Sequence, residues 1–395
     1  MAPVILRESA VDRDIGRLDR AWSEPPTFAF VPDKAQVDDR WIGEALASLP
    51  LDLQLGHFAL LTSGSTGKPK LVIGERVRSE ALARTLHEVQ SAEPVAETIV
   101  SLPLTYCYAF VNQWLWARVS RRRLVLTRGF SEPDRLRAVL EAADRAMLCL
   151  VGAQVPLLRQ LLDGLVFPGV IRLHFAGGRF PQEHLDLLAA TFPNAEVFNN
   201  YGCAEAMPRL TLRRAAESTA ARNIGRPLPG VQLRTGAGGR LLFRSPFRAP
   251  AFHDDDGLRL IADDEWVETG DFGHAADDGT WALDGRSNEV FKRYGEKVSM
   301  PQLLATAHAA WHGEAACYRE RDSEGEDGCV LVLAPEPSQA QVRDLLRAFR
   351  GGWPRPHWPL RIEAMAALPK LANRKIDTGS LPAAEDKQVL WRQRI

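Results

Sequence analysis

The feature that most constrains the fold is an alternation of short apolar segments with longer amphipathic segments between residues 57 and 200. The short apolar segments read as strands, and they are HFALLT, ETIVSLP, RLVLT, MLCLV, VIRLHF and EVFNN. The segments between them read as helices by the spacing of their apolar residues, and they are residues 76–89, FVNQWLWARV, PDRLRAVLEAA, QVPLLRQLL and PQEHLDLLAATF. Strands that alternate with helices form crossover units, so this pattern predicts an α/β fold with a mainly parallel sheet.

The pattern changes twice after residue 200. From about residue 223 to 284, short strands separated by Gly and Asp turns predict a small β-rich subdomain. After the run GRSNEVFKRYGEKVSM, helices and strands predict a compact α+β unit of about a hundred residues. We therefore expect a large N-terminal domain over residues 1–284 and a small C-terminal domain over residues 285–395.

Composition excludes several classes of protein. The 395 residues are 45% apolar and 25% charged with a net charge of −1, so nothing global points to nucleic acid or an anionic membrane as a partner. Five cysteines without a CxxC pair argue against a disulfide framework or a zinc site and for a reduced compartment. The charged start lacks the apolar core of a signal peptide, and no stretch of about 18 apolar residues exists. We expect a cytoplasmic protein without a membrane span.

A glycine-rich run follows the first predicted strand, and its members are Thr62, Ser63, Gly64, Ser65, Thr66, Gly67 and Lys68. Glycines let the backbone approach an anion, hydroxyls add donors and the lysine adds a positive charge, which suits a triphosphate. The run is not a P-loop NTPase motif, because only two residues separate its glycines and Pro69 follows the lysine. Since Pro69 disfavours helix at Lys68, we expect the loop to join two extended segments. The alternative is a flexible surface turn.

This run resembles the phosphate-binding loop of the adenylate-forming superfamily, which includes acyl-CoA synthetases, the adenylation domains of nonribosomal peptide synthetases, and luciferases. The resemblance recurs in order from about His57 to Asp377. The further motifs are AGGR at 176–179, NYGCAE at 200–205, NIGRPLPG at 223–230, ETGD at 268–271, the run from GR at 285–286, and LPKLANRKID at 368–377.

The NYGCAE motif resembles the family's adenine and magnesium motif. The resemblance implies that Tyr201, flanked by Asn200 and Gly202, stacks beside the adenine of ATP. It also implies that Glu205 helps to hold Mg²⁺, for which a carboxylate is a suitable hard ligand. The sequence departs from the family at Ala204, where the family usually has Thr and therefore a hydroxyl near the phosphates.

Two other motifs complete the implied nucleotide site. The pair Gly177 and Gly178 resembles the family's glycines beside the acid and the adenine. Asp271 resembles the family's ribose clamp, since a carboxylate can accept hydrogen bonds from both ribose hydroxyls, and Arg286 would reach the ribose or a phosphate.

The C-terminal motifs imply a hinge and a catalytic lysine. Asn288 stands where the family usually has the hinge Asp, and Lys292 and Gly295 match the segment used in the second half-reaction. Lys375 matches the family's closing lysine, although Arg374 replaces the usual Gly before it. The resemblance implies that the C-terminal domain rotates between the two half-reactions.

The implied reaction forms an acyl-adenylate. A carboxylate attacks the α-phosphorus of ATP, Lys375 bridges the two, and Mg²⁺ held through Glu205, with the loop around Lys68, stabilises the leaving pyrophosphate. A thiol of coenzyme A, or of the phosphopantetheine arm of a separate carrier protein, then takes the acyl group.

The acid pocket is expected at Tyr106, Tyr108, Gly178 and Cys203. No Asp follows Tyr106, where amino-acid-activating relatives place one, which favours an aryl or other simple carboxylic acid. Aromatic side chains are also common in protein cores, so a packing role for them stays open.

Other interpretations remain open. Ala204, Asn288 and Arg374 fit a catalytically impaired protein that binds acyl groups or nucleotides. An enzyme that passes the acyl group to an amine fits equally. Only about sixty residues precede the loop, fewer than in the family, and apolar surface exposed by this reduction would favour a homodimer.

Overall fold

The protein is described from a computed structural model of residues 1–395. The described residues are 4–33, 35, 37–63, 69–162, 164–178, 180–220, 222–286, 289–294, 296–370 and 376–393. Contacts divide the chain into two compact units, each described by itself. The first unit comprises residues 1–236, 241–269 and 275–282, and the second comprises 237–240, 270–274 and 283–395. The domain boundary expected at 284/285 and its hinge stay predictions.

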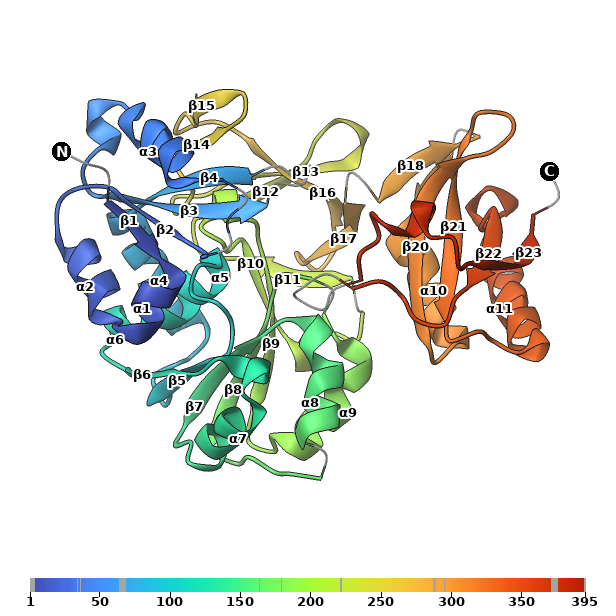
Figure 1. Ribbon diagram of the computed structural model, residues 1–395, viewed down its shortest axis with the longest axis horizontal. Helices are drawn as coiled ribbons and strands as arrows, with labels where there is room; N and C mark the ends of the chain where they lie inside the picture. Colours follow the sequence, from blue (N-terminus) through green and yellow to red (C-terminus); the bar gives the residue numbers. More distant parts are fainter. Residues whose placement is uncertain are drawn as a thin grey trace. The chain divides into compact units, whose positions relative to one another are not determined.

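One sheet of the first unit carries the N-terminal strands (Figure 1). Its strands, in spatial order, are β1 (Val4–Arg7), β2 (Phe28–Val31), β3 (His57–Ser63), β4 (Pro69–Glu75), β14 (Ala251–Asp254) and β15 (Gly257–Leu260). The first three strands are parallel, and the pairs β3–β4, β4–β14 and β14–β15 are antiparallel. The hairpin of β3 and β4 therefore lies inside a mixed sheet.

A second sheet contains the strands that alternate with helices. In spatial order it runs β12 (Gln232–Thr235), β13 (Arg240–Arg244), β16 (Val267–Ala275), β17 (Trp281–Arg286), β11 (Asn223–Pro227), β10 (Thr211–Arg214), β9 (Glu196–Tyr201), β8 (Val170–Phe175), β7 (Ala146–Leu150), β5 (Glu97–Val100) and β6 (Arg123–Leu126). The strands from β6 to β9 are parallel, and β10 and β11 are antiparallel. The predicted α/β fold with mainly parallel strands is confirmed.

Helices cover the parallel strands in Figure 1. The α-helices of the first unit are α1 (Glu8–Arg13), α2 (Gly16–Ser23), α3 (Asp39–Ala47), α4 (Arg76–Val89), α5 (Cys107–Ala109), α6 (Trp116–Ser120), α7 (Pro133–Glu141), α8 (Val155–Leu162) and α9 (Leu185–Thr191). A π-helical segment, Phe110–Leu115, joins α5 to α6. Apolar residues of α7, α8 and α9 pack against β5, β7 and β8 in one core cluster, which is why these segments show an apolar face in the sequence.

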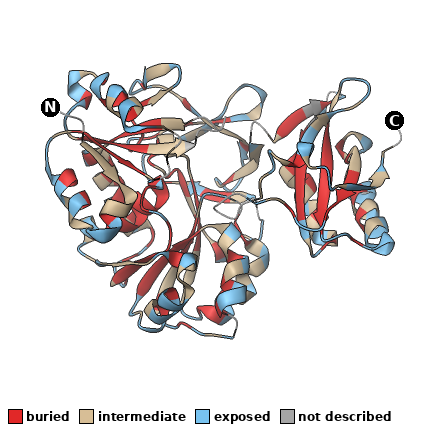
Figure 2. Cartoon of the chain, in the orientation of Figure 1, coloured by how far each residue is buried: buried red, intermediate tan, exposed pale blue. Residues whose placement is uncertain are grey.

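The second unit has its own sheet and core. Its sheet runs β20 (Glu314–Arg321), β21 (Asp327–Ala334), β22 (Arg361–Ala364) and β23 (Gln388–Arg392). A separate hairpin comprises β18 (Val290–Arg293) and β19 (Glu296–Ser299), and the helices are α10 (Met300–Ala310) and α11 (Gln339–Gly352). Figure 2 shows buried residues concentrated on the strands of this unit, where two apolar clusters form its core.

Strands from residues 223–284 do not form a sheet of their own. β14 and β15 extend the first sheet, whereas β11, β12, β13, β16 and β17 extend the second. The segment is rich in strands, as expected, but its strands complete two larger sheets. In the described part of the chain, no helix is both long and apolar enough to cross a bilayer.

Candidate functional site

Several predicted site residues lie outside the described residues. They are Gly64, Ser65, Thr66, Gly67 and Lys68 of the phosphate loop, Asn288 and Gly295 of the hinge and thiol segment, and Lys375. The side chains of Ser63 and Lys292 are likewise outside the description. The site is therefore built from the residues that flank these segments.

The phosphate loop joins two strands. β3 ends at Ser63 and β4 begins at Pro69, and the two strands pair in antiparallel register with Thr62 opposite Lys70. The Thr62 hydroxyl donates to the carbonyl of Lys70 over 3.4 Å. The expectation that the loop joins extended segments instead of starting a helix is confirmed.

Lys70 pairs with the carboxylate expected to hold a metal. Its Nζ lies 2.9 Å from Glu205 Oε1, and each side chain is 20% exposed. The same Nζ lies 4.2 Å from the centre of the Phe252 ring. The backbone N–H of Ala249 donates to the Glu205 carbonyl over 2.9 Å, which ties this turn to the segment before β14. Two motifs 135 residues apart thus meet at one ion pair.

Sequence reasoning did not assign a role to Lys70. The sequence feature that could have identified Lys70 is its position as the second lysine of the run GKPK, directly after Pro69, where β4 begins. Glu205 alone fits a Mg²⁺ site of the kind completed by substrate phosphates and water, because Mg²⁺ commonly takes only one or two carboxylates from a protein. Among the described residues, no group of three or more His, Cys, Asp or Glu side chains could hold a metal ion by itself.

The NYG motif ends a central strand. Asn200 and Tyr201 close β9, and both side chains are buried. A Cβ at Gly202 would lie 1.8 Å from the carbonyl oxygen of Pro208, so only glycine fits there. The chain then turns through Ala204–Ala206 before β10. This close approach explains why a glycine follows Tyr201.

The glycine pair follows the neighbouring parallel strand. Gly177 has a φ of +71°, a conformation that glycine adopts without strain. A Cβ on Gly178 would meet nothing within 4 Å, so open space lies beside it. Since β8 and β9 are parallel, the glycine pair and the NYG motif lie at the same edge of the sheet, where α/β proteins bind ligands.

The two tyrosines of the expected acid pocket differ in exposure. Tyr106 is 46% exposed, whereas Tyr108 is 9% exposed. Burial, together with the Glu205 carboxylate, raises the pKa of the intervening Cys107 thiol. Cys203 is partly buried. Whether these residues contact an acid stays a prediction.

Arg209 lies in the interior beside Tyr108. Its Nη1 donates to Asn200 Oδ1, and its Nη2 donates to Asn112 Oδ1 over 2.6 Å. Its guanidinium lies 5.7 Å from the centre of the Tyr108 ring. No motif in the sequence identified Arg209 as a site residue. The feature that could have done so is a charged residue within an apolar stretch, four positions after Glu205.

The predicted ribose residues belong to the second unit. Arg286 Nε lies 3.6 Å from Asp271 Oδ1, and the Asp271 side chain is 12% exposed. Within this unit the two residues named for the ribose are therefore close together. Their contact with a nucleotide stays a prediction.

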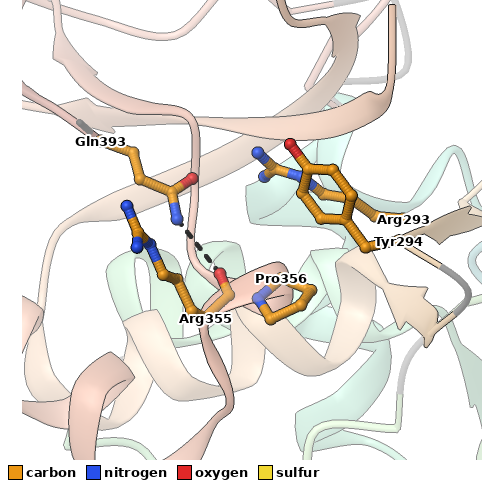
Figure 3. A pocket seen from close by; sticks show the side chains of 5 residues that line it. All are labelled: Arg293, Tyr294, Arg355, Pro356 and Gln393. Carbon is orange, nitrogen blue, oxygen red and sulfur yellow. Dashed lines mark hydrogen bonds between the residues drawn. The ribbon is translucent and has the colours of Figure 1, made fainter. Parts of the chain in front are cut away.

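A cavity of about 270 Å³ opens beside the predicted thiol segment in the second unit. Figure 3 shows Arg293 and Tyr294 on one side of it and Arg355 and Gln393 on the other. Gln393 Nε2 donates to the carbonyl of Arg355 over 3.2 Å. Tyr294, with a φ of 48°, sits in the turn between β18 and β19.

Comparison with known proteins identifies relatives. The profile of a family described as AMP-binding enzyme matches residues 31–236. Tyrocidine synthase 3 from Brevibacillus parabrevis is 24% identical over 363 residues, covering 86% of this chain and 6% of that protein. A non-ribosomal peptide synthetase from Streptomyces venezuelae is 25% identical over 349 residues, covering 82% of this chain and 34% of that protein.

A shorter relative is also similar along most of the chain. The 2,3-dihydroxybenzoate-AMP ligase of Bacillus subtilis is 23% identical over 359 residues, covering 84% of this chain and 65% of that enzyme. The chain thus spans less than two thirds of the length of each of these three relatives.

Solved structures share the fold. An o-succinylbenzoate CoA synthetase from Bacillus subtilis, in complex with its acyl-adenylate intermediate, superposes with a TM-score of 0.71 at 16% identity. The superposition covers 91% of this chain and 79% of that chain.

Proposed function

Since the chain belongs to the AMP-binding enzyme family, we propose that it uses ATP to activate a carboxylic acid as an acyl-adenylate and then transfers the acyl group to a thiol. The observation that carries this proposal is the ion pair between Lys70 and Glu205. It joins the strand that leaves the phosphate loop to the carboxylate of the NYGCAE motif. A loop suited to phosphates and a carboxylate suited to Mg²⁺ are both needed to bind ATP as its magnesium complex.

In the first half-reaction, an oxygen of the acid bonds to the α-phosphorus of ATP while the bond to pyrophosphate breaks. The acid is already ionised at neutral pH, so no general base is needed. Lys375 bridges the acid and the α-phosphate, and Lys68 with its neighbouring hydroxyls binds the departing pyrophosphate. Glu205 would hold Mg²⁺, which would supply positive charge to the phosphate oxygens.

The second half-reaction uses the segment around Gly295. A thiolate attacks the acyl carbon, AMP leaves with the electron pair of the broken bond, and a thioester forms. We propose coenzyme A or the phosphopantetheine arm of a carrier protein as the thiol. The similarity to a non-ribosomal peptide synthetase supports the carrier protein, and the similarity to a CoA synthetase supports coenzyme A.

The acid is an aryl or other simple carboxylic acid. The absence of an Asp after Tyr106 in the sequence disfavours an α-amino acid, whose ammonium group needs an anionic partner. The similarity to an aryl acid–AMP ligase supports the same choice. Amino acids should therefore be poorer substrates than their deaminated analogues.

Acid-dependent exchange of pyrophosphate into ATP tests the proposal. Wild-type protein should catalyse exchange with at least one acid of an aryl, fatty and amino acid panel. Lys375→Ala should lower the exchange rate by roughly 10²–10³-fold, because one oriented cation at the reacting phosphate is worth about that much.

The matched control is Lys370→Ala. Lys370 lies in the same segment, its side chain is 44% exposed, and its Nζ pairs with Glu314 at 2.6 Å. This variant should exchange at nearly the wild-type rate. If folded protein binds ATP but exchanges with no acid, the chain is a nucleotide-binding protein and the proposal is wrong.

A further inference from the structure

A cluster of buried polar side chains surrounds Arg209 in the first unit. We define the Arg209 cluster as Arg209, Asn200, Asn112, Tyr108, His174 and Cys149. Arg209 lies in the segment between Ala204–Ala206 and β10, and the other members come from β7, β8, β9, the α5 segment and the π-helical segment. None is more than 9% exposed, and Arg209 itself is 1% exposed.

Within the described part of the chain, no carboxylate balances the charge of Arg209. The hydrogen bonds that its guanidinium donates there go to the neutral amide oxygens of Asn200 and Asn112. Among the described residues, no Asp or Glu forms an ion pair with it. Burial lowers its pKa to about 10, so the group remains a cation at neutral pH. A buried cation without an anion is unfavourable, because desolvation is not offset by a nearby opposite charge.

The neighbouring groups are neutral as well. Burial raises the pKa of Tyr108 well above its ordinary value and that of Cys149 to about 12, so neither supplies a negative charge. Burial, together with the nearby Arg209 charge, lowers the pKa of His174 well below its ordinary value. The cluster therefore carries a net positive charge inside the protein.

Three polar atoms of the cluster also lack partners. Among the described residues, Tyr108 Oη, Asn112 Nδ2 and His174 Nε2 are buried without a hydrogen-bond partner. His174 Nδ1 lies 3.3 Å from Asn200 Nδ2, so the tautomer that accepts there carries its proton on Nε2. A buried donor without an acceptor costs about 1–3 kcal/mol. Three polar atoms without a partner and one cation without a neighbouring anion therefore lie in one place.

The cluster adjoins the site of the proposed reaction. Tyr108 belongs to the expected acid pocket, and Asn200 directly precedes the tyrosine expected beside the adenine. His174 lies on β8, which leads into the glycine pair, and open space lies beside Gly178. His174 and Asn200 each stand one residue before the end of their strand, so the cluster lies at the edge of the sheet where the acid is expected.

We propose that the acid substrate carries a second carboxylate, which forms an ion pair with Arg209 and accepts hydrogen bonds from Asn112 and His174. The proposal rests on the proposed function and narrows its substrate class to dicarboxylic acids. One carboxylate reacts with ATP, and the other balances the buried cation. A monocarboxylic acid would leave that cation unpaired and is therefore rejected.

Matched pairs of acids test the proposal in wild-type protein. Benzoate is compared with phthalate, isophthalate and terephthalate, and hexanoate is compared with adipate, in pyrophosphate exchange. At least one dicarboxylate should exceed its monocarboxylic partner in kcat/KM by roughly 10²–10⁴-fold, as expected for a site that leaves buried polar groups unpaired with the wrong substrate. Equal or better exchange with the monocarboxylates overturns the inference while leaving the proposed function intact.

Variants test whether Arg209 causes the preference for a dicarboxylate. Arg209→Met should remove the preference for the dicarboxylate, and Arg209→Lys should retain part of it because it keeps the charge. The control is Arg213→Met, because Arg213 is equally buried but donates to the carbonyls of Ser218 and Ala220 and to Gln182. A preference that survives Arg209→Met overturns the inference.

A binding measurement separates this inference from the proposed function. The preferred dicarboxylate should raise the Tm of the wild type and not that of Arg209→Met. If no acid supports exchange, the proposed function fails, and this shift still decides the role of Arg209. A wild-type Tm that no dicarboxylate raises would then overturn the inference too.

Discussion

Arg209 in the first unit, which is buried, and Arg361 in the second, which is partly buried, have opposite surroundings. In the second unit, Arg361 Nε lies 2.6 Å from Glu363 Oε1 and Nη2 lies 2.7 Å from Glu320 Oε2. Its Nη2 also donates to Tyr318 Oη over 2.9 Å. Lys387 Nζ lies 3.6 Å from Glu363 Oε2. We call these residues the Arg361 network.

The positive and negative charges of the Arg361 network balance one another, whereas the positive charge of the Arg209 cluster is unbalanced. The hydrogen bond to Glu320 raises the pKa of Arg361, whereas burial without a carboxylate lowers that of Arg209. A network that is complete within the protein rigidifies the fold, and a network that lacks one charge can acquire it from a ligand. The contrast indicates a structural role for the first and a binding role for the second.

The largest expected effect is the difference in stability loss when Arg361 and Arg209 are each replaced by Met. Arg361→Met removes the ion pairs of Glu320 and of Glu363, whose side chain is 4% exposed and keeps only Lys387 and Tyr318, so the second unit should lose about 3–5 kcal/mol of stability. Arg209→Met removes an unbalanced charge and should cost at most about 1 kcal/mol, because relief of desolvation offsets the lost amide contacts. Hydrogen exchange in denaturant, followed separately for β20–β22 and β7–β9, measures both. Equal losses would contradict the comparison.

The next largest effect on stability is expected when a carboxylate is added beside Arg209. Asn112→Asp is nearly isosteric and supplies a carboxylate 2.6 Å from Arg209 Nη2, so it should stabilise the first unit by about 1–2 kcal/mol. The control is Asn199→Asp. Asn199 is 5% exposed and donates to the Asn223 carbonyl, so a carboxylate there should destabilise. A lower Tm for Asn112→Asp than for the wild type would count against an unbalanced cation.

A smaller effect appears on acidification. The hydrogen bond from Arg361 lowers the pKa of Glu320 from an ordinary value of 4.5. A lowered folded pKa contributes stability that is present above pH 4.5 and lost as the pH falls through the folded value. The second unit should therefore lose stability below about pH 4.5, and Glu320→Gln should lose less over the same range. Thermal melts of both proteins between pH 3 and 7, roughly the range of acid unfolding, measure the difference. Parallel curves would exclude this role for Glu320.

The smallest effect concerns Glu8, a carboxylate that forms no ion pair within the described residues. Burial and the nearby Asp12 raise the pKa of Glu8, which accepts a hydrogen bond from Thr105 over 3.3 Å. A raised folded pKa means that stability falls as the pH rises through it. Glu8→Gln should therefore raise the Tm at neutral pH and leave it unchanged well below pH 4.5. A Tm gain of the same size at both pH values would contradict this cause.

Local patterns predicted many elements well. The helix expected over residues 76–89 is α4, although Val77, counted on its apolar face, is 72% exposed. The N-terminus of α3 is capped by Asp38, whose side chain accepts a hydrogen bond from the Trp41 N–H. Such elements are predictable because spacing and capping are local properties.

Other elements were missed because their signals are short. β1 and β2 have four residues each, and β23 has five with little burial. A run of four apolar residues has no period to recognise, so only its neighbours in a sheet identify it as a strand. The strands of residues 223–284 were expected, but pairing with distant partners decided which sheet each one joins.

By itself, the sequence determined the α/β alternation, the loop between two extended segments and the family, because these depend on residues that are near one another in the chain. The tertiary structure alone decided that Lys70 meets Glu205 and that Arg209 lies buried between amides without a carboxylate. Burial and charge balance depend on which distant residues surround a group, and no local pattern encodes that.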